Sequence, residues 1–261
     1  MPLRIALLTA VLLWPALPQT PSHPLQAALE LFNSGKYKEC FDIVSPYVQQ
    51  NPESPTAHKL LGMDQYMLGY PPREALKEVL RATELAPRDA DAFYYLGRLY
   101  FSADNAPGAL GAFQKAVELD PLSVKAHTQM GQTYEVLGRM ADAEKAYLQA
   151  IELDRKQVKK SGWPYYSIGL LCWNNGRKEE SVAYFREAIA RNPGLSEAKI
   201  KLAVALSNQK PEEARRLLEE VVRADAGNAE GHYRLALLLS KSGKQQEAAE
   251  QFALFEKCRK P

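Results

Sequence analysis

Apolar and small side chains recur along this chain with a period of about 34 residues, from residue 21 to the C-terminus. In residues 90–123, which make up one period, Leu96 and Tyr100 lie four residues apart, as do Ala109 and Phe113. This spacing places each pair on one face of an α-helix. A turn separates the two pairs and a proline follows the second, so each period predicts two helices joined by a tight turn.

Two columns of the period hold only small residues. The eighth position is Ala28, Gly62, Gly97, Gly131, Gly169, Ala203 and Ala236. The twentieth position is Cys40, Ala75, Ala109, Ala143, Ser181, Ala214 and Ala248. Helices that cross closely need small side chains where their axes approach, and added volume there costs about 1–3 kcal/mol. We therefore expect the two helices of each period to cross at these columns.

The pattern resembles the tetratricopeptide repeat, with its signature W-x2-L-G-x2-Y, then A-x3-F, then P. The residues that carry the resemblance are Phe93, Leu96, Gly97, Tyr100, Ala109, Phe113, Ala116 and Pro121. The same register gives seven units: 21–54, 55–89, 90–123, 124–157, 162–195, 196–228 and 229–261. The resemblance implies an all-α fold, a right-handed superhelical solenoid of antiparallel helix hairpins in one continuous domain.

The register is irregular in three places. The turn at 69–72 holds one extra residue, and the turn near 210–211 lacks one. Residues 158–161 form an insertion between the fourth and fifth units.

Residues 1–20 stand outside the repeat and have the pattern of a signal peptide. Arg4 precedes a largely apolar run over 5–17, as in a secretory signal. The run is shorter than the roughly 20 residues that span a bilayer. Pro18 fits poorly just before a cleavage site, so the sequence leaves removal of the segment open. We expect an exported protein, periplasmic or secreted if bacterial, and membrane-anchored if the segment stays attached.

The charge balance argues against nucleic acid as a partner. The chain has 33 Lys and Arg against 31 Asp and Glu, a formal net charge of +2. Phosphate binding requires a concentrated basic surface instead. The one basic cluster, Arg155, Lys156, Lys159 and Lys160, is interpreted as a solvated linker rather than an anion site.

The cysteines are too far apart in the register to form a disulfide. Cys40, Cys172 and Cys258 fall in the first, fifth and seventh units, whereas a disulfide needs Cα atoms within about 7 Å. We expect all three to be small core residues.

Three of the four histidines, His58, His127 and His232, occupy the fourth position of the second, fourth and seventh units. These units are not adjacent, so no two of the rings can share a metal ion. We expect each ring to replace the aromatic residue that the family places there, packing by its edge. The sequence therefore predicts no metal and no cofactor.

No catalytic motif occurs in the sequence, neither a nucleophile elbow nor a P-loop, HExxH or paired cysteines. Carboxylate pairs such as Glu179 and Glu180 fall on polar helix faces and favour solubility. The sequence therefore predicts a protein that is not an enzyme.

The resemblance implies that the concave wall is built from the first helix of each unit. That wall is rich in aromatic and methionine side chains, which contribute strongly to protein interfaces. The candidate peptide-binding residues are Phe32, Tyr66, Tyr94, Arg98, Phe101, Trp163, Tyr166, Leu170, Trp173, Asn174 and Asn208. Trp163, Tyr166 and Trp173 are expected to share one helix face. The alternative is that part of this wall packs against neighbouring units.

Some members of the family bind a chaperone C-terminus through a carboxylate clamp of Lys, Asn and Arg. In this sequence Lys59 and Lys125 match that pattern, but Met63, Tyr95 and Gln129 replace its other residues. We therefore expect no such clamp.

The last unit carries Phe252 and Phe255, and no polar helix follows them in the sequence. Terminal repeats usually need a polar outer face. This edge is either a slightly apolar surface or a docking surface for another chain, including a second copy.

The sequence thus predicts a non-catalytic interaction scaffold of the cell envelope that binds a protein or peptide segment in its concave groove. The alternative function is a structural spacer that assembles through its C-terminal edge.

Overall fold

The structure, a computed structural model, describes residues 24–158 and 160–259 of the chain. Over these residues it contains fourteen α-helices and no strand. Their bounds are α1 Pro24–Asn33, α2 Tyr37–Gln50, α3 Pro55–Met67, α4 Pro72–Leu85, α5 Ala90–Ser102, α6 Ala106–Leu119, α7 Val124–Val136, α8 Met140–Lys156, α9 Trp163–Asn174, α10 Lys178–Arg191, α11 Ser196–Leu206, α12 Pro211–Ala224, α13 Ala229–Lys241 and α14 Gln245–Cys258. None of these helices is long and apolar enough to cross a membrane.

The expected export signal lies outside the described residues.

Consecutive helices pair as hairpins, α1 with α2 and so on to α13 with α14. One hairpin falls within each of the seven expected units. The second helix of each hairpin also packs against the first helix of the next. The prediction of an all-α solenoid of helix hairpins is therefore confirmed.

The small residues of the repeat lie where the two helices of a hairpin cross. A Cβ added to Gly97 on α5 would lie 2.6 Å from Cδ1 of Phe113 on α6. A Cβ added to Gly131 on α7 would come still closer to the ring of Tyr147 on α8. Both rings are fully buried, so they have little room to move aside. This close packing explains why the column tolerates only Gly and Ala.

Local sequence signals fix where the helices begin and where they turn. Ser54 and Asp89 cap α3 and α5 by accepting hydrogen bonds from backbone N–H groups in the first turn. Gly138, between α7 and α8, has a φ of 72°, a conformation that favours glycine. Asp104, in the turn between α5 and α6, also has a positive φ, of 55°.

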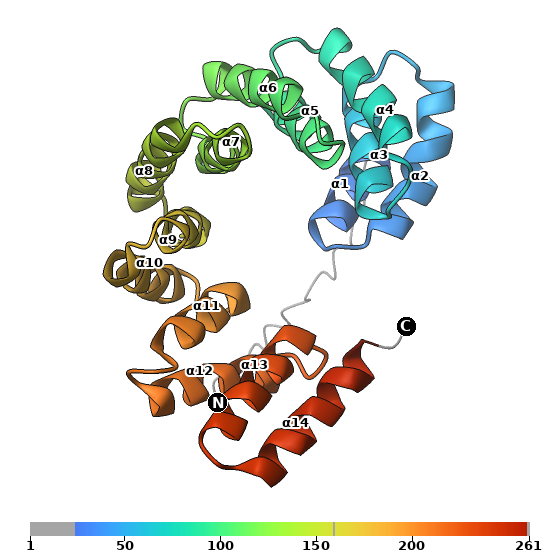
Figure 1. Cartoon of the computed structure of the whole chain (residues 1–261). Helices are drawn as coiled ribbons and strands as arrows, with labels where there is room; N and C mark the ends of the chain where they lie inside the picture. The colour runs from blue at the N-terminus through green and yellow to red at the C-terminus, as the bar shows by residue number, and fades with distance from the viewer. Residues whose placement is uncertain (1–23, 159, 260–261) are drawn as a thin grey trace, which may run out of the picture.

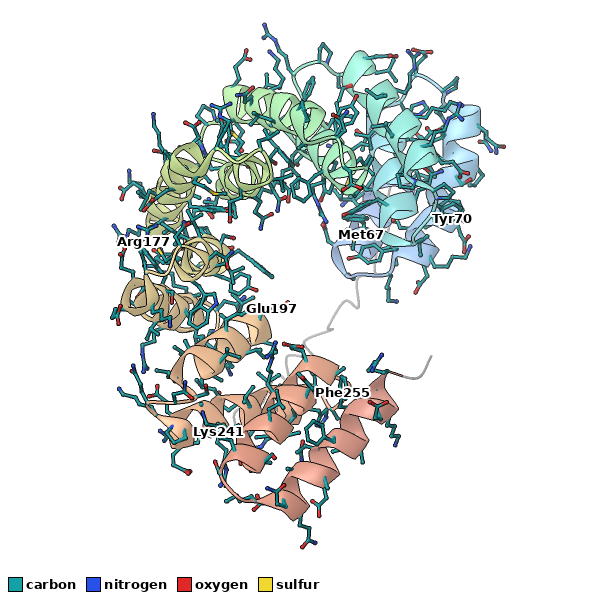
Figure 2. All side chains as sticks on the ribbon, in the orientation of Figure 1. Met67, Tyr70, Arg177, Glu197, Lys241 and Phe255 are labelled. Atoms are coloured by element: carbon teal, nitrogen blue, oxygen red, sulfur yellow. The ribbon has the colours of Figure 1, made fainter. Side chains whose placement is uncertain are left out.

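The seven hairpins follow one another around an open arc (Figure 1). Helices α5, α7 and α9 line its inner side, and α6, α8 and α10 lie outside them. Most neighbouring inner helices contact each other, but α9 and α11 do so less than the others. Met67 and Glu197 lie on the inner side of the arc, whereas Arg177 lies on the outer side (Figure 2).

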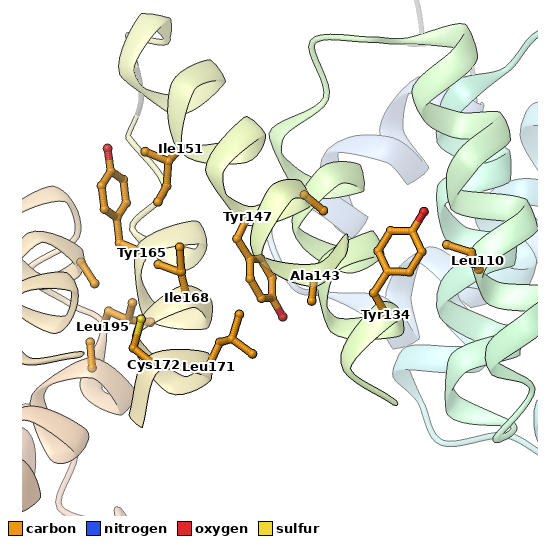
Figure 3. Close-up of a cluster of buried hydrophobic side chains, with 13 residues drawn as sticks. Leu110, Tyr134, Ala143, Tyr147, Ile151, Tyr165, Ile168, Leu171, Cys172 and Leu195 are labelled. Carbon is orange, nitrogen blue, oxygen red and sulfur yellow. The ribbon is translucent and has the colours of Figure 1, made fainter. Parts of the chain in front are cut away.

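The hydrophobic core runs as a ribbon between the inner and outer helices. In the middle of the chain it includes Tyr134 on α7, Tyr147 on α8 and Leu195 before α11 (Figure 3). A second cluster extends from Phe185 on α10 to Ala248 on α14. Because each hairpin buries side chains against its neighbours, the units stabilise one another.

Candidate binding surface on the concave face

The insertion between the fourth and fifth units is fixed by a buried carboxylate. Asp154 on α8 is fully buried, and its Oδ1 accepts a hydrogen bond from the Ser161 backbone N–H at 2.8 Å. Its Oδ2 pairs with Arg191 on α10 at 3.1 Å. The Arg191 guanidinium also lies 4.6 Å from the ring centroid of Tyr165. These contacts hold the end of the insertion against the fifth hairpin.

The insertion leads directly into α9 through a tight turn. Gly162 has a φ of 78°, and a Cβ added there would lie 2.8 Å from the carbonyl oxygen of Ala188. Trp163 follows as the first residue of α9 and remains 42% exposed. Its ring stands edge-on to that of Tyr166, with 5.6 Å between centroids. The chain thus positions an exposed indole on a fixed backbone.

Trp163 borders a hollow on the concave face between α5, α7 and α9. The hollow has a volume of about 390 Å³. It is lined by Tyr94, Arg98, Val124, Lys125, Thr128, Gln129, Gln132, Ser161 and Trp163. This lining contains two cationic side chains and no carboxylate, so it favours anionic groups. We call it the central hollow.

The two cations of the central hollow have different partners. The Lys125 ammonium pairs with the Asp91 carboxylate at 2.5 Å. The Arg98 guanidinium instead lies 5.0 Å from the ring centroid of Tyr66 and 5.9 Å from that of Tyr95. Among the residues that the structure describes, no carboxylate forms an ion pair with Arg98. The stacked guanidinium can therefore pair with an external anion.

The aromatic wall of the first three hairpins packs largely against itself. Phe32 on α1 reaches Tyr95 on α5, with 6.5 Å between ring centroids. Tyr95 lies edge-on to Tyr94 at 5.1 Å, and burial raises the pKa of Tyr95 to about 12. Tyr94 is itself buried and packs on Phe113 at 6.0 Å. Phe32 and Tyr94 therefore offer less free surface than a groove residue would.

The aromatic face expected on α9 is divided between surface and core. Tyr166 packs on Phe185, with 6.1 Å between centroids, and burial raises the pKa of Tyr166. Leu170 and Trp173 are half-buried against the core cluster of the following hairpins. Of the three aromatic residues predicted to form this face, Trp163 is the exposed one.

The remaining candidate residues lie outside the central hollow. Phe101 is half-buried in the cluster around Phe113. Asn174 is exposed at the end of α9. Asn208 is exposed and accepts a hydrogen bond from the Lys241 ammonium. The structure thus brings Tyr94, Arg98 and Trp163 together in the lining of the central hollow. Tyr66 lies against Arg98 and Tyr166 against Trp163, and the other candidates lie elsewhere.

Several lining residues were absent from the predicted set. The resemblance implies that the concave wall is built mainly from positions 2, 5, 9, 12 and 13 of each unit. Lys125 occupies position 2 of the fourth unit, so the repeat register contained a signal for it. Gln129 stands one position outside the expected wall columns. Ser161 belongs to the insertion, for which the register makes no prediction.

Further along the concave face the lining changes in charge. A hollow of about 240 Å³ beside Tyr166 is lined in part by Glu197, Lys201 and Glu230. Two carboxylates and one ammonium replace the cationic lining of the central hollow. The concave face is therefore not uniform along its length.

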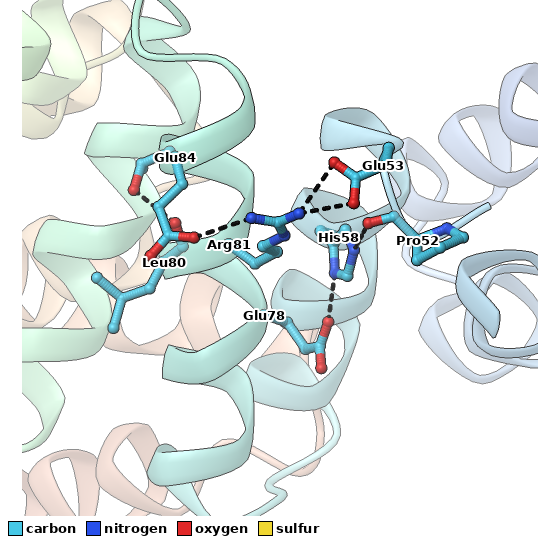
Figure 4. Close-up of polar contacts among 8 residues, drawn as sticks. Pro52, Glu53, His58, Glu78, Leu80, Arg81 and Glu84 are labelled. Carbon is cyan, nitrogen blue, oxygen red and sulfur yellow. Dashed lines mark hydrogen bonds and ion pairs between the residues drawn. The ribbon is translucent and has the colours of Figure 1, made fainter.

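A larger hollow, of about 640 Å³, lies beside α4. His58 Nδ1 lies 2.6 Å from Oε2 of Glu78 (Figure 4). Arg81 pairs with Glu53 at 2.8 Å and with Glu84 at 3.2 Å (Figure 4). His58, Glu78 and Arg81 already have partners within the chain, and the other charged lining residues include Arg73 and Lys77. Because these two lie on α4, the second helix of its hairpin, the central hollow is the stronger candidate for a site on the first helices.

Each of the three repeat histidines forms a hydrogen bond to the preceding unit. Nε2 of His58, His127 and His232 lies 2.9, 3.1 and 3.1 Å from the carbonyl oxygen six residues earlier. The rings therefore connect neighbouring units by hydrogen bonds, which packing by the ring edge alone did not predict. In the described parts of the chain, no group of three His, Cys, Asp or Glu side chains is placed to hold a metal ion.

All three cysteines are free. Cys40 and Cys172 are buried, as expected of core residues. Cys258 is only half-buried at the end of α14, where its thiol lies 3.4 Å from the carbonyl oxygen of Ala226. The core expectation is therefore wrong for Cys258, because α14 has no following hairpin to cover it within the described residues.

The phenylalanines of the last hairpin are partly covered by their own unit. Phe252 and Phe255 pack on Tyr233, with centroid distances of 6.2 and 5.2 Å. The Arg259 guanidinium lies 5.3 Å from the Phe255 ring. Leu254 is 39% exposed, which makes it the apolar side chain most available at this edge.

Two family models described as tetratricopeptide repeat match the sequence. One matches residues 123–194, and the other matches 72–124 and 203–258. No curated protein matches the sequence significantly.

Solved structures of such proteins share the fold. A thermophilic TPR protein of Thermus thermophilus is 23% identical with a TM-score of 0.60, over 70% of this chain and 97% of that one. A tetratricopeptide repeat protein of Parabacteroides merdae is 18% identical with a TM-score of 0.64, over 91% and 92%. PilF of Pseudomonas aeruginosa is 24% identical with a TM-score of 0.59, over 67% and 79%. At these identities the likeness concerns the architecture.

Proposed function

This chain belongs to the tetratricopeptide repeat family, and on that premise we propose that it is a non-catalytic scaffold that binds a protein segment on its concave face. The central hollow is the proposed contact region. Trp163, Arg98 and Tyr94 are its predicted binding residues, and Lys125, Gln129 and Ser161 join them.

The observation that carries this proposal is the exposed indole of Trp163 on a fixed backbone. An exposed Trp beside a hollow is a typical anchor, because burying its ring contributes strongly to binding. The buried Asp154 and the turn at Gly162 hold its backbone in place. A preorganised anchor loses little conformational entropy on binding.

Site-specific photo-crosslinking of the full chain tests this proposal. We place a photoreactive amino acid at Gln132, which lines the central hollow, and separately at Leu148, which is 46% exposed on α8. Crosslinks to a partner are expected from position 132, and Trp163→Ala is expected to remove them. Leu148→Ala is the matched control and is expected to leave them unchanged. Equal crosslinking from positions 132 and 148 contradicts the proposal, and so does crosslinking from position 132 that Trp163→Ala leaves unchanged.

We also propose that the protein is exported, on the basis of the pattern in residues 1–20. N-terminal sequencing of the protein from fractionated cells tests this. An intact Met1 on cytosolic protein contradicts export, and a new N-terminus on envelope or secreted protein supports it.

A second function, assembly through the C-terminal edge, is supported by the exposure of Leu254 on α14. It would use the end of the solenoid and leave the central hollow free. The two functions therefore respond to different substitutions.

A further inference from the structure

We propose that the central hollow binds an acidic peptide segment, with a partner carboxylate on Arg98 and a neighbouring apolar side chain on Trp163. This inference rests on the proposed function of the concave face and adds the chemistry of the partner.

The charge of the hollow gives the first argument. Its lining contains Arg98 and Lys125 and no carboxylate. The Lys125 ammonium pairs with the Asp91 carboxylate at 2.5 Å, whereas Arg98 stacks on the rings of Tyr66 and Tyr95 and has no ion-pair partner within the described residues. An incoming carboxylate therefore meets one unpaired guanidinium and a second, partly neutralised cation.

The preorganisation of Arg98 gives the second argument. Its guanidinium lies against the rings of Tyr66 and Tyr95, at 5.0 and 5.9 Å from their centroids. These rings restrict the side chain before any ligand arrives. A planar guanidinium held in this way is suited to pairing with a carboxylate.

The rest of the lining indicates a peptide rather than a small anion. Trp163 presents an indole next to the cations. Gln129 and Gln132 carry side-chain amides that can donate to and accept from a peptide backbone. A segment with an acidic residue beside an aromatic, aliphatic or proline residue matches all of these groups.

This site differs from the carboxylate clamp of the family. Lys59, which matches that clamp in the sequence, forms an ion pair with Asp89 at 2.6 Å. The other hollows of the first helices are lined differently. Glu197 and Glu230 line the next one, and in a further one, lined by Arg234 and Lys241, the Arg234 guanidinium already pairs with Glu230 at 2.7 Å. Among these hollows, the central one is where a guanidinium has no ion-pair partner within the described residues.

Selection from a displayed library of random twelve-residue peptides on the full chain tests the inference. We expect the enriched peptides to contain Asp or Glu next to an apolar residue more often than the starting library. Fluorescence anisotropy of one enriched peptide is expected to show at least about tenfold weaker binding to Arg98→Gln. Arg98→Lys is expected to recover part of this loss, and added salt to weaken binding.

Arg216→Gln is the matched control, because it removes the same charge from an exposed position on α12. It is expected to bind as the wild type does. Circular dichroism of each variant shows whether the helices are retained.

The possible failures are distinguishable. If the enriched peptides lack acidic residues but lose binding in Trp163→Ala, the concave site stands and the acidic preference is wrong. If acidic peptides bind Arg98→Gln as tightly as the wild type, the role of Arg98 is wrong. If no peptide is enriched whose binding depends on Trp163, both the proposed function and this inference are overturned.

Discussion

The carboxyl group of Asp64 on α3 faces the thiol of Cys40 on α2 inside the first two hairpins, and both side chains are fully buried. Neither Asp64 oxygen has a hydrogen-bond partner of good geometry among the described residues, and a thiol is a weak donor. Burial raises the pKa of Asp64 from 3.8 to about 6, although the contact with Cys40 acts to lower it. An ionised Asp64 is therefore unfavourable in the folded chain.

We predict that the contribution of this carboxyl to the stability of the protein is less favourable at neutral pH than near pH 4. The folded state keeps a proton that the unfolded state releases above pH 3.8, so stability falls as the pH rises from about 4 to 6. The deficit above pH 6 is about 3 kcal/mol. Asp64→Asn should therefore change the melting temperature more favourably at pH 7.5 than at pH 4. Thermal unfolding of the variant and the wild type at both pH values measures this difference. Asp42→Asn, at an exposed site on α2, is the control. A stability difference between Asp64→Asn and the wild type that is the same at both pH values would falsify this prediction.

Gly131→Ala should destabilise the protein by about 1–3 kcal/mol. The added methyl group would overlap the buried ring of Tyr147. Gly111→Ala, in the middle of α6 where an added Cβ meets no neighbouring atom, should instead stabilise by about 0.5–1 kcal/mol through the helix backbone. Urea unfolding followed by circular dichroism compares the two. Similar effects of both substitutions would show that the helix crossing is not tightly packed.

Asp154→Ala should destabilise the protein by about 3 kcal/mol, because it leaves Arg191 without its buried partner. It also removes the acceptor for Ser161 and should loosen the insertion. Limited trypsin digestion is expected to cleave faster after Arg155 or Lys156 in this variant. Glu250→Ala, at an exposed position on α14, is the control and should change little. Unchanged digestion in Asp154→Ala would mean that other contacts fix the insertion.

Leu254→Glu tests assembly through the C-terminal edge without disturbing the fold. Leu254 is exposed, whereas Phe255 packs on Tyr233, so Phe255→Glu should also lower the stability of the last hairpin. If the edge mediates self-association, sedimentation velocity will show concentration-dependent association that Leu254→Glu removes. If the groove carries the function, Leu254→Glu will leave both sedimentation and crosslinking from position 132 unchanged.

The repeat register predicted the architecture because its columns report local and nearest-neighbour packing. Gly131 must be small since Tyr147 lies against it, and both residues belong to one unit. The same register assigns the three cysteines to different hairpins, on α2, α9 and α14, and the three repeat histidines likewise, on α3, α7 and α13. Contacts of this kind recur at a fixed sequence distance, so one period is enough to reveal them.

The candidate site was less predictable because it depends on contacts that do not repeat. The ring of Phe32, in the first unit, packs on that of Tyr95, in the third unit, which withdraws the Phe32 ring from the expected groove. Trp163 owes its position to Asp154, Ser161 and Arg191, and the insertion that contains Ser161 has no counterpart in the register. Sequence columns indicate which residues face inward but not which of them are covered by a neighbour.

The histidine hydrogen bonds make the stiffness of the solenoid vary along its length. They tie the first unit to the second, the third to the fourth and the sixth to the seventh. Three junctions have no such bond among the described contacts: those between the second and third, the fourth and fifth, and the fifth and sixth units. Of these, the junction between the fifth and sixth units is the one where the first helices, α9 and α11, touch least. We expect a change in superhelical pitch to be concentrated at that junction. A partner bound between α5 and α9 would then contact helices that keep their relative positions, while α11–α14 move together as a rigid body.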